Sequence, residues 1–168
     1  MAEQIDGIRV CRFCCEWLSD GIGESFKEWN RMGNRTAASR VFIQSPTGTG
    51  KTTFILEKLY PYAMRQGRSI LYLGNRVALK EQTENTIKRF FEKQCIPGVI
   101  EDADAATIAY CPNQEAAIVL VDYQAFMGLD SNKLPNNLYY IILDEAHFFM
   151  EDALFNPWTG MLLECLTG

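Results

Sequence analysis

The stretch that decides the fold is IQSPTGTGKTT at residues 43–53, where two glycines and a lysine directly follow a short apolar run. Glycine loses more conformational freedom on folding than any other residue, so a Gly-Thr-Gly turn at a strand end indicates that something approaches the main chain closely. The pattern predicts a strand at 41–45, a turn at 46–50 and a helix that begins at Lys51.

Outward from this turn, short apolar runs alternate with longer segments of helical period, which is typical of strand-helix-strand units. The helix after the turn is expected to stop at Gly67, and TIAYC at 107–111 is a weaker strand candidate. The other predicted elements are strands at 69–74, 117–122 and 138–143 and a helix at about 76–93. We therefore expect an α/β fold with a mostly parallel sheet, helices on both faces, and a last strand that is covered on both sides.

The length and composition fit a domain with its own core. The chain has 168 residues, of which 48% are hydrophobic and 12% aromatic. Residues 1–40 contain short helical patterns broken by glycines, so they are expected to form an N-terminal helical extension packed on a core domain at 41–168. Apolar side chains at helical spacing between 158 and 166 could be either core or a docking face.

The charge is unevenly distributed along the chain. Residues 65–93 carry seven bases and three acids, whereas residues 94–168 carry one base and eleven acids. A nucleic-acid contact is therefore expected from the middle third or from another part of a longer protein. No apolar run is long enough for a signal peptide or a membrane span, so we expect a cytoplasmic protein with no membrane partner.

The six cysteines, at positions 11, 14, 15, 95, 111 and 165, include one C-x-x-C pair in CRFCC. A structural zinc site needs four ligands, and neither a second such pair nor a set of spaced histidines is present. We expect no zinc site, and we interpret the cysteines as buried free thiols in a reducing compartment.

A turn that directs backbone N–H groups inward at the positive end of a helix binds phosphate oxygens. Lys51 can reach the β- and γ-phosphates of a nucleotide, and the Thr52 hydroxyl can ligate Mg²⁺. The spacing nearly fits G-x-x-x-x-G-K-[ST], and the alternative of a tight glycine turn with an incidental lysine does not explain the flanking strand and helix. The predicted cofactor-binding residues are Ser45, Pro46, Thr47, Gly48, Thr49, Gly50, Lys51, Thr52 and Thr53.

A second cluster, IILDEAH at 141–147, places Asp144 and Glu145 at the carboxyl end of a predicted strand, where open α/β sheets bind ligands. Because consecutive side chains of a strand point in different directions, Asp144 can face a Mg²⁺ shell while Glu145 faces a water in line with the γ-phosphate. We predict Asp144 as a metal ligand and Glu145 as the general base. The alternative is that both acids stabilise the start of a following helix.

SPTGTGKT at 45–52, followed about 90 residues later by DEAH at 144–147, resembles the first and second motifs of superfamily 2 helicases and translocases, the DEAD/DEAH-box relatives. Ser45 in place of the first glycine fits the style of that first motif. The resemblance implies the first RecA-like P-loop domain of such a protein, with ATP and Mg²⁺ as cofactors. The catalytic residues that it implies are Lys51, Asp144, Glu145 and His147, the last of which would couple the site to a second domain.

Two further segments resemble the nucleic-acid-binding motifs of that superfamily. LYLGNRVALKEQ at 71–82 resembles motif Ia, and VDYQAF at 121–126 resembles motif Ib. Motif Ia offers a helix N-terminus and a basic side chain to a nucleic-acid phosphate, although an ordinary amphipathic helix is the alternative for this segment. The nucleic-acid contacts that the resemblance implies are Asn75, Arg76, Gln82, Tyr123 and Gln124.

Several family features have no counterpart in this sequence: the S-A-T motif, the second RecA-like domain with its arginine fingers, and the glutamine motif for adenine. Since arginine fingers stabilise the transition state, we expect the chain to bind nucleotide and to hydrolyse it poorly. A chain cut from a longer helicase or translocase is the favoured interpretation. The alternatives are a stand-alone P-loop regulatory module and, less favoured, a small P-loop kinase.

Overall fold

A computed structural model describes most of the chain up to residue 144. The described residues are 2–5, 8–12, 17–31, 40–46, 48–74, 77–94, 97–103, 106–126, 128–130, 132 and 134–144. The contacts divide the chain into two compact units, Met1–Leu59 and Tyr60–Gly168.

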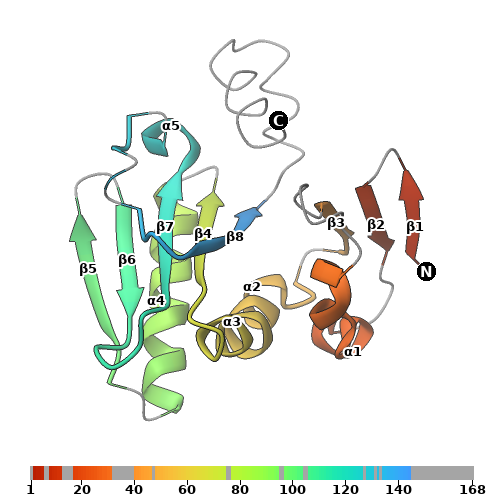
Figure 1. Ribbon diagram of the computed structural model, residues 1–168, viewed down its shortest axis with the longest axis horizontal. Helices are drawn as coiled ribbons and strands as arrows, with labels where there is room; N and C mark the ends of the chain where they lie inside the picture. The colour runs from red at the N-terminus through yellow and green to blue at the C-terminus, as the bar shows by residue number, and fades with distance from the viewer. Residues whose placement is uncertain are drawn as a thin grey trace. The chain divides into compact units, whose positions relative to one another are not determined.

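The first unit contains a three-stranded sheet of β1 (Ala2–Ile5), β2 (Ile8–Arg12) and β3 (Arg40–Gln44), in that order (Figure 1). β1 and β2 pair antiparallel, and β2 pairs with β3 in parallel. The prediction that residues 1–40 are helical is therefore wrong for β1 and β2. Ile5, Ile8 and Val10 favour extended backbone, but the pairing of β2 with β3 joins distant segments and could not be read locally.

The helical part of the first unit consists of α1 (Leu18–Ile22), the 3₁₀ helix η1 (Ser25–Arg31), α2 (Lys51–Phe54) and the wider π turn η2 (Ile55–Leu59). An aromatic group holds these segments together. The ring of Phe26 meets Phe54 edge-on at 5.6 Å, and Trp29 lies 6.3 Å from both rings. Edge-to-face aromatic pairs add to the energy of burial, so η1 anchors the helix that follows the glycine turn.

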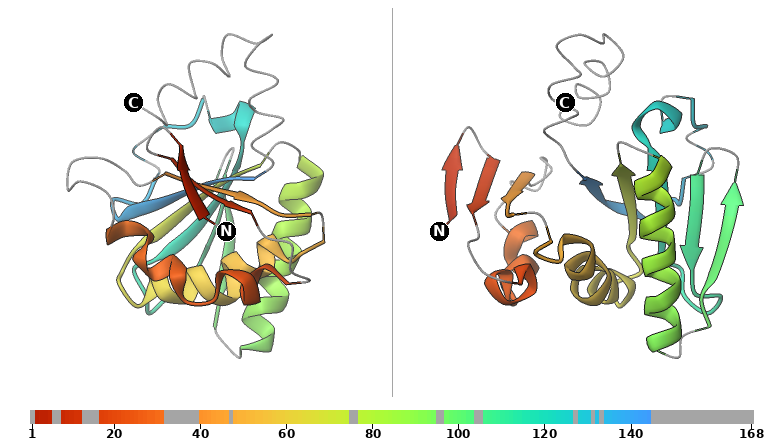
Figure 2. Two further views of the ribbon diagram at one scale, coloured as in Figure 1. Left: turned by 90° about the vertical axis from the view of Figure 1, so that its right-hand side faces the viewer. Right: turned by 180° about the vertical axis from the view of Figure 1, so that it is seen from behind.

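The second unit is a five-stranded sheet with helices packed against β4 and β7, which confirms the predicted α/β fold (Figures 1 and 2). The strand order is β5-β6-β7-β4-β8. In chain order the elements are α3 (Tyr60–Met64), β4 (Ser69–Gly74), α4 (Val77–Lys93), β5 (Val99–Ala103), β6 (Ala106–Tyr110), β7 (Ala117–Asp122), α5 (Tyr123–Phe126) and β8 (Leu138–Leu143).

The sheet is parallel where β4 pairs with β7 and β8, and antiparallel through β5, β6 and β7. The predicted strands at 69–74, 117–122 and 138–143 and the helix at 76–93 are confirmed within one residue. β6 corresponds to the weaker candidate, whereas β5 was not predicted. The two acids of β5 obscure the apolar pattern of a strand. Both bond side chains of β6: Glu101 accepts a hydrogen bond from the Tyr110 hydroxyl at 2.9 Å, and Asp102 accepts one from the Thr107 hydroxyl at 2.7 Å.

β4 and β7 form the buried centre of the sheet, since the first five residues of each strand are buried. α4 lies along one face (Figure 2, right), where Ile87, Phe90 and Phe91 are buried and both phenylalanine rings lie 6.4 Å from that of Tyr60. β8 was expected to be covered on both faces, and this prediction is wrong. Tyr139 and Ile141, which share one face of β8, are each 48% exposed, and β8 is the outermost strand at its end of this sheet.

The helices within these described ranges are too short or too polar to cross a membrane.

Asn137, just before β8, bonds the segments that lead into β4 and β7. Its side-chain amide donates to the backbone carbonyls of Gly67 at 2.8 Å and Glu115 at 3.0 Å. Its carbonyl oxygen accepts the Ser69 hydroxyl at 2.8 Å, and that hydroxyl accepts the backbone N–H of Ala117 at 3.0 Å. Ser69 is fully buried, so this network satisfies polar groups that water does not reach.

We expect Asn137→Ala to lower the free energy of unfolding by about 2 kcal/mol, because it leaves the Ser69 hydroxyl and two carbonyls without this partner. Urea unfolding followed by circular dichroism measures the change. Asn132→Ala is the matched control: that side chain is exposed and bonds Asp130, so a loss below about 0.5 kcal/mol is expected. Equal losses in the two variants would contradict the role of the network.

Candidate nucleotide-binding site

The turn between β3 and α2 has the backbone conformation that the two glycines suggested. Gly48 has φ of 82° and Gly50 has φ of 77°, both in the left-handed region that L side chains avoid. Gly50 is also the N-cap residue of α2. A Cβ placed on Gly48 would meet no atom within 4 Å, so the main chain at this exposed glycine is open to a ligand.

Thr49 braces the turn from inside. This residue is only 7% exposed, and its hydroxyl lies 3.1 Å from the Ser45 hydroxyl and 2.9 Å from the Pro46 carbonyl oxygen, to which it donates. Its own carbonyl accepts the backbone N–H of Leu18 at 2.8 Å. The hydroxyl of Thr49 therefore holds the loop in shape, and a ligand contact by this residue would come from its main chain.

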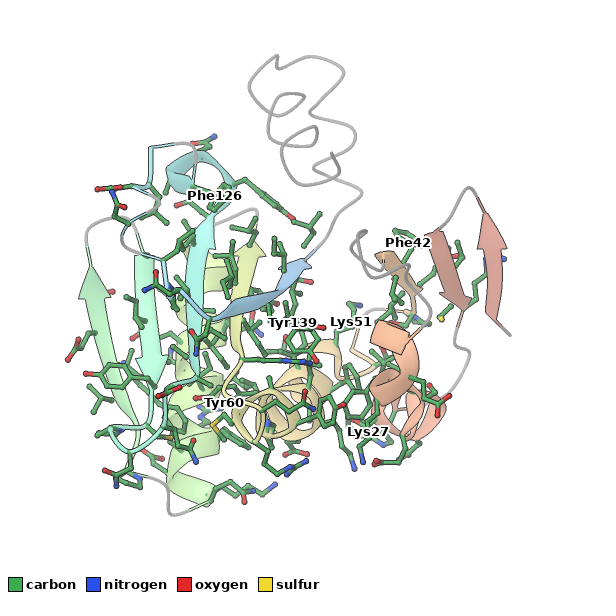
Figure 3. The ribbon with its side chains drawn as sticks, viewed as in Figure 1. Lys27, Phe42, Lys51, Tyr60, Phe126 and Tyr139 are labelled. Atoms are coloured by element: carbon green, nitrogen blue, oxygen red, sulfur yellow. The ribbon has the colours of Figure 1, made fainter. Side chains whose placement is uncertain are left out.

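Lys51 begins the helix and lies beside the loop (Figure 3). Its ammonium group donates to the Pro46 carbonyl at 3.2 Å in an exposed position. The first helical hydrogen bond runs from the Phe54 N–H to the Gly50 carbonyl at 2.8 Å, and Thr52 and Thr53 are half-buried on the first turn. An open glycine backbone with a cation at its edge fits a phosphate group. Thr47 lies outside the described residues.

Trp17 was not predicted to belong to the site. The ring of this tryptophan packs on the loop, since a Cβ added to Gly50 would lie 3.3 Å from Cε3 of Trp17. The side chain is nevertheless 52% exposed. No local pattern pointed to it, because it precedes Gly50 by 33 residues and carries no motif of its own.

Asp144 directly follows β8 and forms hydrogen bonds with β4 and with the start of α5. Its N–H donates to the Leu73 carbonyl at 2.9 Å. Its main-chain carbonyl accepts the Tyr123 hydroxyl at 2.7 Å, and its carboxylate Oδ2 accepts the Tyr72 hydroxyl at 2.5 Å. Asp144 is half-buried at the carboxyl end of its strand, the edge that the sequence predicted. Glu145 and His147 lie outside the described residues.

The predicted nucleic-acid residues differ in their surroundings. Tyr123 is 7% exposed and packs in the core with Leu73 and Val121, so its predicted contact with nucleic acid is corrected to a structural role. Gln82 on α4 and Gln124 on α5 are exposed. Asn75 and Arg76 lie outside the described residues.

Asp122, at the end of β7, accepts the backbone N–H of Ala125 at 2.7 Å. A carboxylate that binds a free N–H of the following turn acts as its cap. The capping bond explains why an acid stands at this position of the segment that resembles motif Ib.

Two of the cysteines, Cys11 and Cys111, lie in the described part of the chain, and both are buried. Burial raises the pKa of the Cys111 thiol, which disfavours the thiolate that a metal needs. Among the described residues, no group of three His, Cys, Asp or Glu side chains could hold a metal ion. Mg²⁺ does not need such a group, because it typically takes one or two carboxylates, of which Asp144 could be one, and completes its shell with nucleotide phosphates and water.

An α/β domain in which a glycine-rich loop joins a strand to a helix belongs to the class of P-loop nucleotide-binding folds. The chain matches the model of the family "Type III restriction enzyme, res subunit" over residues 15–163 and belongs to that family. It is thereby a helicase-like ATP-binding domain of superfamily 2. Comparisons with curated proteins and with solved structures gave no match.

We expect nucleotide binding to change the fluorescence of Trp17, because its exposed ring packs on Gly50 of the loop. The emission spectrum is recorded while ADP and Mg²⁺ are added. The response should disappear in Trp17→Phe and persist in Trp29→Phe, whose ring packs on Phe26 and Phe54 instead. A response that survives in Trp17→Phe would show that the ring does not sense the loop.

Proposed function

We propose that this chain is the ATP-binding part of a superfamily 2 motor of the DEAH-box type, which couples ATP hydrolysis to movement on DNA or RNA. The observation that carries the proposal is the loop from Gly48 to Lys51, in which open glycine backbone and a lysine ammonium group lie together at the start of a helix. The family match over residues 15–163 supports the same class of protein.

In this proposal the loop amides and Lys51 bind the β- and γ-phosphates, and Lys51 exchanges its contact with the Pro46 carbonyl for the phosphate oxygens. Thr52 and Asp144 hold the metal shell, and Glu145 takes the proton of the attacking water. Bound Mg²⁺ would neutralise charge on the phosphates. His147 is proposed to couple the site to a second RecA-like domain.

Nucleic acid would be bound by the full-length protein. On this chain the proposed contacts are Asn75, Arg76, Gln82 and Gln124, and Tyr123 is no longer among them. The surplus of bases in residues 65–93 supports a phosphate contact there, whereas the surplus of acids lies in residues 94–168. We also propose a cytoplasmic location for the protein.

We expect Lys51→Ala to weaken nucleotide binding by about tenfold or more, because it removes a charge-assisted bond to phosphate. Isothermal calorimetry with ADP and Mg²⁺ at low salt measures the affinity. Lys58→Ala is the matched control, since Lys58 is an exposed lysine in the next turns of the same helical run. Unchanged affinity in Lys51→Ala, with circular dichroism showing a folded variant, would count against the assignment.

We expect this chain alone to hydrolyse ATP at least about a thousandfold more slowly than the full-length protein acting on its polymer, since transition-state charge is stabilised by arginine fingers of a second domain. ATPase rates are compared for both proteins with single-stranded and duplex DNA and RNA. Stimulation by one of these polymers supports the motor. If no polymer stimulates the full-length protein, the regulatory-module interpretation is favoured instead.

A further inference from the structure

The carboxylate of Asp144 is bonded by a tyrosine from the neighbouring strand. Tyr72 lies on β4 opposite Ile142 of β8, two residues before Asp144. Its side chain extends along the sheet, and its hydroxyl reaches Oδ2 of Asp144 at 2.5 Å. Tyr72 is 5% exposed and Asp144 is half-buried, so the bond is partly buried.

We propose that Tyr72 is a positioning residue: by its bond to Oδ2 it fixes the rotation of the Asp144 carboxylate and so prepares that group for Mg²⁺. This inference rests on the proposed function, in which Asp144 holds the metal shell. Outer groups that bond a metal ligand fix its orientation, and their loss lowers metal affinity.

The hydroxyl of Tyr72 stands out from its surroundings on β4. Its neighbours Ile70, Leu71 and Leu73 are buried and apolar, and a phenylalanine ring would supply the same apolar packing. A buried hydroxyl is favourable only where it has a polar partner, and the carboxylate is such a partner.

The backbone of Asp144 is fixed separately from its side chain. The Leu73 carbonyl and the Tyr123 hydroxyl bond the main-chain N–H and C=O of Asp144. These two bonds act on the main chain, whereas the Tyr72 bond acts on the carboxylate itself and restricts its rotation. Loss of the Tyr72 hydroxyl should therefore affect the carboxylate while the end of β8 stays in place.

The test is a Mg²⁺ titration of ADP binding by the whole chain, in wild type and Tyr72→Phe, with the melting temperature of both measured in EDTA. We expect Tyr72→Phe to raise the half-saturating Mg²⁺ concentration by about tenfold. ADP affinity in EDTA should be the same in both proteins, which a merely structural role of Tyr72 would not predict. An unchanged Mg²⁺ dependence, or an equal loss of affinity with and without the metal, overturns the inference.

Tyr110→Phe is the matched control, because the Tyr110 hydroxyl also donates a hydrogen bond to a carboxylate, that of Glu101. Two strands, β7 and β4, separate it from β8. Its Mg²⁺ dependence should equal that of the wild type. A Mg²⁺ shift in Tyr110→Phe as large as that in Tyr72→Phe would overturn the inference, since the effect would then not depend on Asp144.

If Tyr72→Phe does not fold, the bond is tested from its other partner. Asp144→Asn keeps an acceptor for the Tyr72 hydroxyl, whereas Asp144→Ala removes that acceptor. We expect Asp144→Ala to melt at a lower temperature than Asp144→Asn in EDTA. Equal melting temperatures overturn the inference.

The failure of this inference can be told from that of the proposed function. A wild-type chain that binds no ADP at any Mg²⁺ concentration overturns the proposed function and the inference with it. A wild-type chain whose Mg²⁺-dependent binding is lost in Lys51→Ala and unchanged in Tyr72→Phe overturns the inference alone.

Discussion

The candidate site depends first on two backbone positions that only glycine adopts without strain. Gly48 and Gly50 lie in the left-handed region on either side of Thr49, whose hydroxyl bonds the loop from inside. The absence of side chains at these two positions both permits the turn and leaves its main chain accessible at Gly48. The shape of the loop is thus held by the chain itself, so little ordering is left for a ligand to impose.

In the second unit, the position of Asp144 depends in the same way on β4. This strand pairs in parallel with β7 on one side and β8 on the other, so the carboxyl ends of the three strands lie at one edge of the sheet. Tyr72 from β4 and Tyr123 from the end of β7 then reach Asp144 after β8. Segments far apart in sequence thus combine to hold one aspartate, at its main chain and at its carboxylate.

The parts of the fold that the sequence predicted are those with a strong local pattern. The strands at 69–74 and 117–122 are apolar runs with clear ends, and the helix at 77–93 carries an amphipathic period. β5 has only two large apolar residues before its acids, so its strand conformation depends on pairing with β6. Burial of β8 was overestimated because apolar composition does not tell whether a strand lies at the edge of a sheet.

The residues of the candidate site also differ in whether a local sequence pattern predicts them. The glycine turn and Asp144 could be found from short motifs, since the chemistry requires fixed residue types at fixed spacing. Trp17 and Tyr72 could not be found, because their contacts join residues that are 33 and 72 positions apart and leave no pattern in either segment. The role of Tyr123 was misread for the same reason: its motif suggested a surface contact, whereas the fold buries it.

The outermost strand at the other end of the sheet has a consequence for association between molecules. β5 pairs with β6 on one side, and its exposed residues include Glu101 and Asp102. A strand from another chain that added to β5 would bring its own backbone against two carboxylates and remove them from water. Exposed acids of this kind discourage edge-to-edge aggregation, so the acids of β5 disfavour pairing of this sheet edge with a strand of another molecule.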